Sequence, residues 1–168
     1  MVGKSHPGIS GKHMASSKGL AAIKSLLAGQ KLAVICSLSS GLPYSNLVAF
    51  AETADLRSLV FATSRDTSKY QNLIKDGRVS LLIDNRTNLP ADFETAKAIT
   101  VLGKALEIET GVDQGYKEVF LAKHANLAHF LNDSQTSLFV VKVSTYILAG
   151  FETAERMDFD NSYMEPSI

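Results

Sequence analysis

The chain has 168 residues, of which 45% are hydrophobic and 20% charged, a composition typical of one globular domain with a substantial core. Lysine and arginine together number 17, as do aspartate and glutamate, so the formal net charge is zero. Proteins that bind the nucleic-acid backbone are usually basic, and we therefore expect no nucleic acid partner.

Cysteine content and hydropathy argue against further classes of protein. The only cysteine is Cys36, so neither an intramolecular disulfide nor a thiol-rich metal centre can form, and no metal site is expected. The residues around Cys36 have the pattern of a strand, and we expect its thiol to be buried. No apolar run reaches the roughly 18 residues of a membrane-spanning helix, and residues 1–16 are polar and glycine-containing. We therefore expect a cytoplasmic protein with a flexible segment over residues 1–16 and no membrane partner.

A single domain is expected over residues 17–151, followed by an irregular acidic tail over residues 152–168. The domain begins with a helix predicted over residues 17–29. Apolar side chains recur there at helical spacing, at Leu20, Ile23, Leu26 and Leu27. Two further helical segments are predicted over residues 67–76 and 112–131. The first of these should end at Gly77 in a left-handed conformation.

Six β-strands are predicted from short runs of apolar or alternating residues. They cover residues 32–38, 44–53, 59–63, 79–84, 98–108 and 138–148. Short turns separate the first three strands, which should form an antiparallel meander, while Gly103 inside the fifth strand indicates a bulge. Strands do not alternate with long helices. The pattern therefore predicts a mainly β protein, a six-stranded antiparallel barrel with a few short peripheral helices.

The segment between the third strand and the second helix is the most informative for function. Four hydroxyl groups and two cations gather there, on Thr63, Ser64, Arg65, Thr67, Ser68 and Lys69. A helix N-terminus presents free backbone N–H groups and a partial positive charge, so this segment could bind a terminal phosphate group. The alternative is an ordinary capped helix start, with Thr67, Ser64 or Asp66 as the cap. The local pattern leaves both interpretations open.

Other candidate motifs carry less weight. The sequence has no Walker-type glycine loop, no G-x-G-x-x-G motif and no G-x-S-x-G nucleophile elbow. His124 and His129 are five residues apart and would not share a helix face as zinc-binding pairs do, so we expect helix-surface or capping roles for them. Glu107 and Glu109 lie on one side of a predicted strand and are expected to be surface residues.

From residue 32 to about residue 151, the order and spacing of several short segments resemble flavoproteins related to pyridoxamine-phosphate oxidase. The segments are GLPYSNLV (41–48), VFAT (60–63), TSKYQNL (67–73), GRVSLLI (77–83), ITVLGKA (99–105) and YILAGF (146–151). The resemblance implies a split β-barrel that binds FMN at the subunit interface of a homodimer.

The resemblance also implies a set of cofactor-binding residues. The phosphate and ribityl end of FMN would be held by Thr63, Ser64, Thr67, Ser68 and Lys69. Asn46, Leu47 and Val48 would lie along the isoalloxazine ring, and Asn72 would contribute from the first turn of the short helix. Residues 84–87 resemble a loop near the cofactor in one uncharacterised branch of the family, which makes Asn85 and Arg86 pocket candidates. The alternative for these two residues is a solvated loop tip.

Vitamin B6 oxidation is not expected, despite the resemblance. Oxidases of pyridoxamine phosphate have a basic, tryptophan-containing C-terminal segment that closes the active site, and an arginine on the flavin-facing strand. This chain has no tryptophan, an acidic tail, and Asn46 at the position of that arginine.

We therefore expect an FMN-dependent oxidoreductase of unidentified substrate, with a reduced nicotinamide or another flavin as the electron donor. No catalytic residue is identified, which is consistent with a flavin that itself carries the electron chemistry. Two alternatives remain: a non-catalytic module that binds a flavin or haem, and a deazaflavin-dependent reductase on the same barrel. Faster turnover than free FMN would distinguish an oxidoreductase from a binding module.

Overall fold

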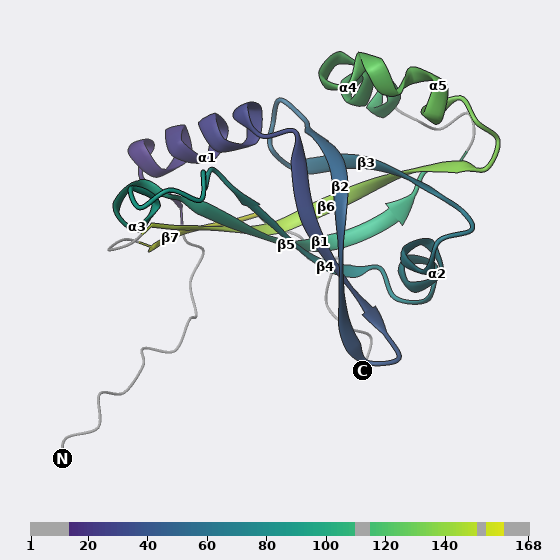
Figure 1. Cartoon of the computed structure of the whole chain (residues 1–168), viewed down its shortest axis with the longest axis horizontal. Helices are drawn as coiled ribbons and strands as arrows, with labels where there is room; N and C mark the ends of the chain where they lie inside the picture. Colours follow the sequence, from purple (N-terminus) through teal and green to yellow (C-terminus); the bar gives the residue numbers. More distant parts are fainter. Residues whose placement is uncertain (1–13, 110–114, 151–153, 160–168) are drawn as a thin grey trace.

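The computed structural model describes residues 14–109, 115–150 and 154–159. Its centre is an antiparallel sheet with the strand order β3-β2-β1-β4-β5-β6-β7, and pairing between β3 and β6 closes a barrel (Figure 1). The strands are β1 (Leu32–Ser39), β2 (Leu42–Glu52), β3 (Ser58–Ser64), β4 (Arg78–Asp84), β5 (Ala98–Glu107), β6 (Thr136–Ala149) and β7 (Ala154–Asp158). Six strands form the closed barrel and β7 lies outside it. The prediction of a mainly β protein with a six-stranded antiparallel barrel is confirmed.

Closure of the barrel depends on the long strand β6. It pairs with β3 on one side, where Phe139 lies opposite Phe61, and with β5 on the other. The register between β5 and β6 shifts between Leu102 and Gly103, which confirms the predicted bulge. A Cβ atom on Gly103 would lie 2.5 Å from the carbonyl oxygen of Lys142, so glycine is needed where the two strands approach at this bend.

The barrel interior is filled by side chains that alternate along each strand with outward-facing ones. Its largest fully buried side chains include Phe50, Phe61, Phe139 and Tyr146. The rings of Phe61 and Phe139 stack with 5.4 Å between their centroids. The Tyr146 hydroxyl donates a hydrogen bond to the carbonyl oxygen of Leu56 at 2.8 Å, and burial raises the pKa of this phenol. The buried hydroxyl is therefore a neutral, satisfied donor.

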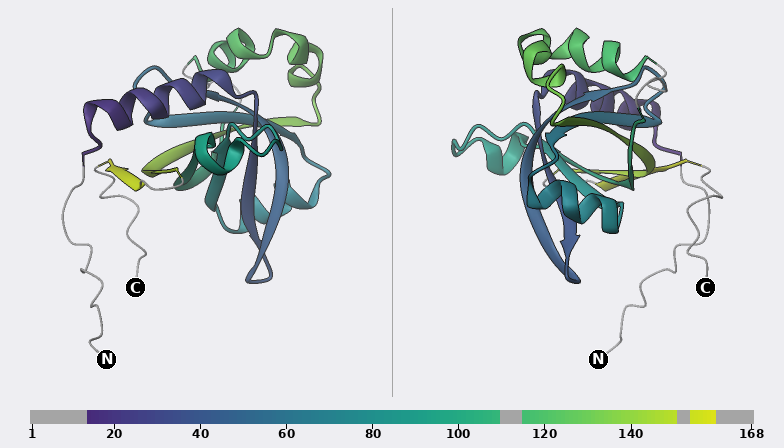
Figure 2. Two further views of the ribbon diagram at one scale, coloured as in Figure 1. Left: turned by 60° about the vertical axis from the view of Figure 1, so that its left-hand side comes forward. Right: turned by 90° about the vertical axis from the view of Figure 1, so that its right-hand side faces the viewer.

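Helices cover the barrel on different sides (Figure 2). The helix α1 (Ser17–Gly29) has the predicted bounds and buries Ile23 and Leu27 against the barrel core. The predicted segment 112–131 is broken into α4 (Tyr116–Lys123), the 3-10 helix η1 (Ala125–Leu127) and α5 (Ala128–Leu131), and residues 112–114 lie outside the described residues. This group packs on the outer side of β2 and β3. The helix α2 (Ser68–Lys75) contacts β1, and α3 (Asp92–Thr95) lies in the β4–β5 connection.

Two expectations about segment ends are wrong. Residues 154–158, expected to be irregular, form β7, because Met157 pairs with Tyr146 and is buried on the core. Gly77 does not adopt the left-handed conformation: among the described glycines, only Gly41 and Gly115 have positive φ. A Cβ atom at Gly77 would instead lie 2.5 Å from the carbonyl oxygen of Ala105 on β5. Residues 1–13, most of the segment expected to be flexible, lie outside the described residues, as do 152–153 and 160–168 of the predicted tail.

The described helices include none that is long and apolar enough to cross a membrane.

Candidate functional site

The predicted phosphate-binding segment, residues 63–69, joins β3 to α2 and is called here the hydroxyl loop. Thr67 is the N-cap of α2: its Oγ1 accepts a hydrogen bond from the backbone N–H of Tyr70 at 3.2 Å and donates one to the carbonyl oxygen of Ser64 at 2.9 Å. Thr63 is buried, with its Oγ1 3.2 Å from that of Thr67. Capping by Thr67 is therefore confirmed, and its hydroxyl is already engaged. Ser68, in contrast, is exposed.

The two cations of the hydroxyl loop have different surroundings. Arg65 forms an ion pair with Glu107, with 2.8 Å between Nη2 and Oε1. The Lys69 ammonium has no hydrogen-bond or ion-pair partner among the residues that the structure describes. Lys69 is partly buried, and this burial lowers the pKa of its side chain. A desolvated ammonium without a counter-charge is suited to receive an anion.

Glu107, at the end of β5, binds Arg65 of the hydroxyl loop, a contact that the sequence did not predict. Its carboxylate also accepts hydrogen bonds from the Tyr70 hydroxyl at 3.1 Å and the buried Ser137 hydroxyl at 2.6 Å. The expectation of a surface role for Glu107 is wrong. Strand alternation could have indicated this, because Glu107 shares the inward face of β5 with the buried Ala105.

Polar side chains gather beside α2 at one end of the barrel, called here the barrel mouth. Asn72 is buried and donates a hydrogen bond from Nδ2 to Ser37 Oγ on β1 at 3.4 Å. Asn46 lies opposite Ile35 in the β1–β2 register and therefore shares the inward face of the sheet. Its Oδ1 is buried and has no hydrogen-bond partner in the described part of the chain. An unsatisfied buried acceptor is rare and costly, and indicates a missing donor.

The three predicted ring-binding residues of β2 do not lie on one face. Val48 faces inward and is 4% exposed, as part of the hydrophobic core. Leu47 faces outward and is 61% exposed. The structure thus places Asn46 at the barrel mouth, buries Val48 below it, and leaves Leu47 on the outer surface of the sheet.

Asn85 and Arg86 are not brought to the barrel mouth within one chain. They follow β4 at Asp84, whereas the residues next to α2 lie at the other end of that seven-residue strand, about 20 Å away at a strand's usual rise. Asn85 Oδ1 accepts a hydrogen bond from the backbone N–H of Lys97 at 2.7 Å, and Arg86 pairs with Asp84 at 3.0 Å. Both side chains are exposed, so within one chain the solvated-loop alternative describes them, and these bonds order the loop.

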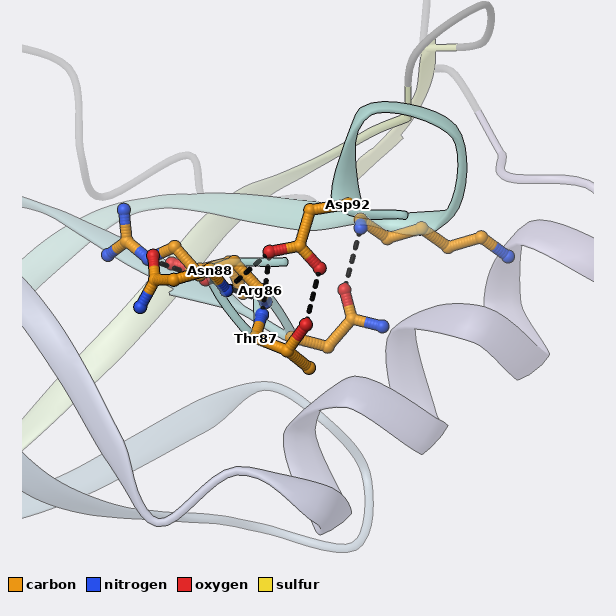
Figure 3. A network of polar contacts seen from close by, with 7 residues as sticks. Arg86, Thr87, Asn88 and Asp92 are labelled. Atoms are coloured by element: carbon orange, nitrogen blue, oxygen red, sulfur yellow. Dashed lines mark hydrogen bonds and ion pairs between the residues drawn. The ribbon is translucent and has the colours of Figure 1, made fainter. Parts of the chain in front are cut away.

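The loop that carries Arg86 is held by Asp92 (Figure 3). The Asp92 carboxylate accepts hydrogen bonds from the backbone N–H groups of Thr87 and Asn88 at 2.7 and 2.6 Å, and from the Thr87 hydroxyl at 2.9 Å. A cavity of 330 Å³ next to this loop is lined by Leu82, Asp84, Arg86, Ala96, Lys97, Ala98, Ala149 and Gly150. Lys97 and Ala98 in this cavity were not expected from the sequence.

The outer face of the sheet carries exposed apolar side chains. Leu47, Val34 and Leu82 are neighbours across β2, β1 and β4, and Leu47 and Leu82 are 61% and 36% exposed. Leu32, at the start of β1, is 50% exposed. Cys36 is also on this face, half-buried and 3.1 Å from Ser45 Oγ, so the expectation of a buried thiol is only partly met. This patch, Leu32, Leu47 and Leu82, is called here the outer leucine patch.

His124 has a different role from an exposed helical histidine. It follows α4 as its C-cap residue, is buried, and its Nε2 lies 2.8 Å from the carbonyl oxygen of Phe50. His129, on α5, is exposed. The expected capping position is thus found for His124 and the surface position for His129.

Solved structures with the same fold include two proteins that are described as cofactor-binding. A heme binding protein from Mycobacterium smegmatis has 18% identity and a TM-score of 0.72 over 80% of this chain and 55% of its own. A FAD-binding protein from Mesorhizobium loti has 12% identity and a TM-score of 0.62, over 81% and 92% of the two chains. This chain therefore spans about half the length of the mycobacterial protein, and at such identities the likeness shows the fold alone.

A third structure, from Clostridium acetobutylicum, is described as related to general stress protein 26 of the pyridoxinephosphate oxidase family. It has 14% identity and a TM-score of 0.67 over 86% of this chain and 97% of its own. No curated protein matches the sequence. The family model described as pyridoxamine 5'-phosphate oxidase matches residues 20–148, from within α1 to the end of β6. Since this match covers the whole barrel, the chain belongs to the pyridoxamine 5'-phosphate oxidase family.

Proposed function

We propose that this chain binds FMN at the barrel mouth and uses it as an oxidoreductase. One observation carries the proposal: the Lys69 ammonium, on α2, and the Asn46 Oδ1, on the strand beside β1, both lack partners within the described residues, and α2 packs against β1. A cation and a buried acceptor are the two groups that a phosphorylated ring with N–H donors would satisfy together.

The phosphate end would be bound by the hydroxyl loop. Lys69 supplies the charge, because Glu107 already neutralises Arg65. Ser68 is exposed and can donate its hydroxyl, and the first backbone N–H groups of α2 add further donors. Thr63 and Thr67 stabilise the conformation of the loop: their hydroxyl groups contact each other, and Thr67 caps the N-terminus of α2. Ser64 Oγ donates to Asp66 at 2.6 Å, so it shapes the loop in the same way.

The isoalloxazine ring of FMN would contact Asn46. Asn72 would contribute indirectly, by its hydrogen bond to Ser37. An amide oxygen in place of an arginine accepts rather than donates, so Asn46 would bind a ring N–H and add no positive charge near the ring. FMN, when bound, supplies the electron transfer, and the protein contributes binding, orientation and access.

We also propose that the protein is a homodimer with the outer leucine patch in its interface. Three exposed leucines on one sheet face lose unfavourable contact with water when a second copy covers them, and a net charge of zero opposes association little. A dimer can also bring together regions that one chain separates. We propose that Arg86 and Lys97 of one subunit complete the cofactor pocket at the other subunit's mouth, with Leu47 beside the ring.

Haem binding is the alternative that a similar fold suggests, since the mycobacterial structure is a heme binding protein. The ring nitrogen Nε2 of the buried His124 is engaged by the Phe50 carbonyl oxygen, which removes it as an axial ligand. The uncompensated Lys69 would attract a flavin phosphate or a haem propionate alike, and the match to the pyridoxamine 5'-phosphate oxidase family is what favours the flavin. The flavin proposal is therefore the better supported of the two.

Comparison of FMN with riboflavin tests the phosphate site, because the two ligands differ only in the phosphate. Lys69→Met should weaken FMN about 10- to 100-fold, the loss of a charge-assisted hydrogen bond, and leave riboflavin nearly unchanged. Lys75→Met, an exposed lysine in the last turn of the same helix, is the matched control and should change neither. Equal losses for both ligands in Lys69→Met would overturn the assignment. Oxidase or reductase turnover no faster than free FMN would leave flavin binding standing but remove the catalytic role.

A further inference from the structure

A second cavity lies away from the barrel mouth, between the β2–β3 turn, β6 and the start of α4. Its volume is 410 Å³, within the range of small-molecule sites, and its polar lining is Thr53, Asp55, Arg57, Ser58, Tyr116 and Lys142. Ser58 and Ser64 are the two ends of β3. The length of that strand, roughly 20 Å, therefore separates this cavity from the hydroxyl loop.

Three hydrogen-bond donors meet at one wall of the cavity. Lys142 Nζ lies 2.6 Å from the Tyr116 hydroxyl oxygen and 3.5 Å from Ser58 Oγ. An ammonium group can only donate, so both hydroxyl oxygens accept from it and each keeps its own proton to give to another acceptor. No other side chain among the described residues accepts either proton. Lys142 itself retains a third N–H.

A fourth group adds charge on the same side. The Arg57 guanidinium lies over the ring of Phe159 at 5.2 Å from its centroid, and it has no hydrogen-bond acceptor among the residues that the structure describes. Lys142 likewise has no carboxylate partner in that part of the chain. The cavity thus holds two cations that form no ion pair with the residues that the structure describes, although Arg57 is near enough to Asp55 to interact with its charge.

The one acidic group of the lining is already engaged. Asp55 Oδ1 accepts hydrogen bonds from the Thr53 hydroxyl at 2.7 Å and from the backbone N–H of Arg57 at 3.0 Å, and these bonds lower the pKa of the carboxyl group. Asp55 therefore fixes the turn that carries Arg57. With Arg57 and Lys142 positive and Asp55 negative, the lining keeps a net positive charge.

We propose that this cavity binds the oxyanion group of a small organic acid or phosphate ester, with Lys142, Tyr116, Ser58 and Arg57 as its donors. An oxyanion is the complement of a site that offers O–H and N–H donors, positive charge and few free acceptors. The site is independent of the flavin proposal: it lies at the opposite end of β3 from the hydroxyl loop and shares no residue with the barrel mouth.

Titration of uniformly ¹⁵N-labelled protein with inorganic phosphate, and separately with acetate, tests the site at constant ionic strength. We expect saturable shifts of the Ser58 and Tyr116 backbone amides with at least one of the two anions. The anion with the lower dissociation constant, phosphate or acetate, indicates whether a phosphate ester or a carboxylic acid is the preferred class of ligand. The absence of saturable shifts at these amides with both anions would overturn the proposal.

Matched variants separate a built site from a general effect of charge. Lys142→Met should raise the dissociation constant of the anion, measured at the Ser58 amide, at least tenfold. Tyr116→Phe should also raise this constant while preserving the ring packing. Lys104→Met is the control, because Lys104 lies directly opposite Lys142 on β5, is exposed and does not line the cavity. Equal weakening by Lys104→Met and Lys142→Met, or none by Lys142→Met in a protein of unchanged fold, would contradict the proposal. Lys69→Met, which should weaken FMN binding, should leave the dissociation constant of the anion at this cavity unchanged.

Discussion

The partly buried ammonium of Lys69 and the unpartnered oxygen of Asn46 are the residues on which the proposed flavin site depends. Both are costly in a protein without ligand, because a desolvated charge and an unsatisfied acceptor lose hydration without gaining a partner. Neighbouring polar groups are satisfied: Arg65 by Glu107, Thr67 by the helix cap, Asn72 by Ser37. This contrast is the reason for proposing that Lys69 and Asn46 bind the ligand.

Substitution of Asn46 should separate stability from binding. In Asn46→Leu, the buried acceptor is removed, so we expect the ligand-free protein to gain about 1 kcal/mol in free energy of unfolding. The affinities for FMN and riboflavin should fall together, because the ring is common to both. Denaturant unfolding and fluorescence titration measure the two effects. A variant that loses stability and binds both flavins normally would show that Asn46 only supports the barrel.

The pH dependence of binding should report Lys69. Burial lowers the pKa of Lys69 below the ordinary lysine value, and only the protonated form attracts phosphate. As the pH rises, the preference for FMN over riboflavin should therefore decline at a lower pH than it would if Lys69 had an ordinary lysine pKa. The phosphate does not contribute to this decline, because it is already fully ionised above its second pKa of about 6. The ratio of the two dissociation constants across alkaline pH measures this. Lys69→Met should have a flat ratio; an identical decline in that variant would refute the assignment.

At the scale of elements, α4 is attached to the barrel through a largely buried ion pair. Lys123 Nζ lies 2.6 Å from Glu52 Oε2 and 2.6 Å from the carbonyl oxygen of Leu27, and 4.1 Å from the centre of the Phe50 ring. The side chains of Lys123 and Glu52 are only 11% and 19% exposed. One lysine thus links α4, α1 and β2.

Removing this lysine should be costly because it leaves the Glu52 carboxylate without its cation. We expect Lys123→Met to lower the free energy of unfolding by about 3 kcal/mol. Lys117→Met on the same helix, whose Nζ contacts the exposed side chain of Asn132 at 2.9 Å, should change it by less than about 0.5 kcal/mol. Thermal or denaturant unfolding measures both variants. Equal effects would mean that α4 is held by its apolar contacts alone.

Periodicity predicted the elements better than it predicted the site. Strand alternation and helical spacing follow from backbone geometry, so α1 and the six barrel strands were found within a few residues. The same alternation separates Leu47 from Asn46 and Val48, which the family resemblance had grouped. Contacts such as Glu107 with Arg65 depend on how strands distant in sequence curve together, and no local pattern contains that information. The outer strand β7 was missed because one buried residue, Met157, is too weak a signal in a polar segment.

At the scale of the whole molecule, the barrel separates the groups that the proposed function needs. The barrel mouth lies at one end of β4, and the loop with Arg86 and Lys97 follows its other end. The outer leucine patch lies on the sheet face beside them. In the proposed dimer, a second copy would cover the exposed leucines and would bring its Arg86 loop towards the barrel mouth.

A charge placed in the outer leucine patch should prevent dimer formation. We expect Leu47→Glu to give a monomer and to weaken FMN, because a buried, unpaired carboxylate is strongly unfavourable at an interface. Leu106→Glu is the control: Leu106 is 42% exposed on β5, outside the patch. Sedimentation equilibrium gives the mass of each variant. A wild-type monomer, or a Leu47→Glu dimer that still binds FMN, would contradict the proposed interface.

The most direct test of flavin binding is the visible absorption spectrum of the purified protein, followed by denaturation and identification of the released ligand. We expect the two absorption bands of oxidised flavin and FMN in the released fraction, or uptake of added FMN by colourless protein. A protein that is colourless and takes up no FMN, or one that releases haem or a deazaflavin, would contradict it.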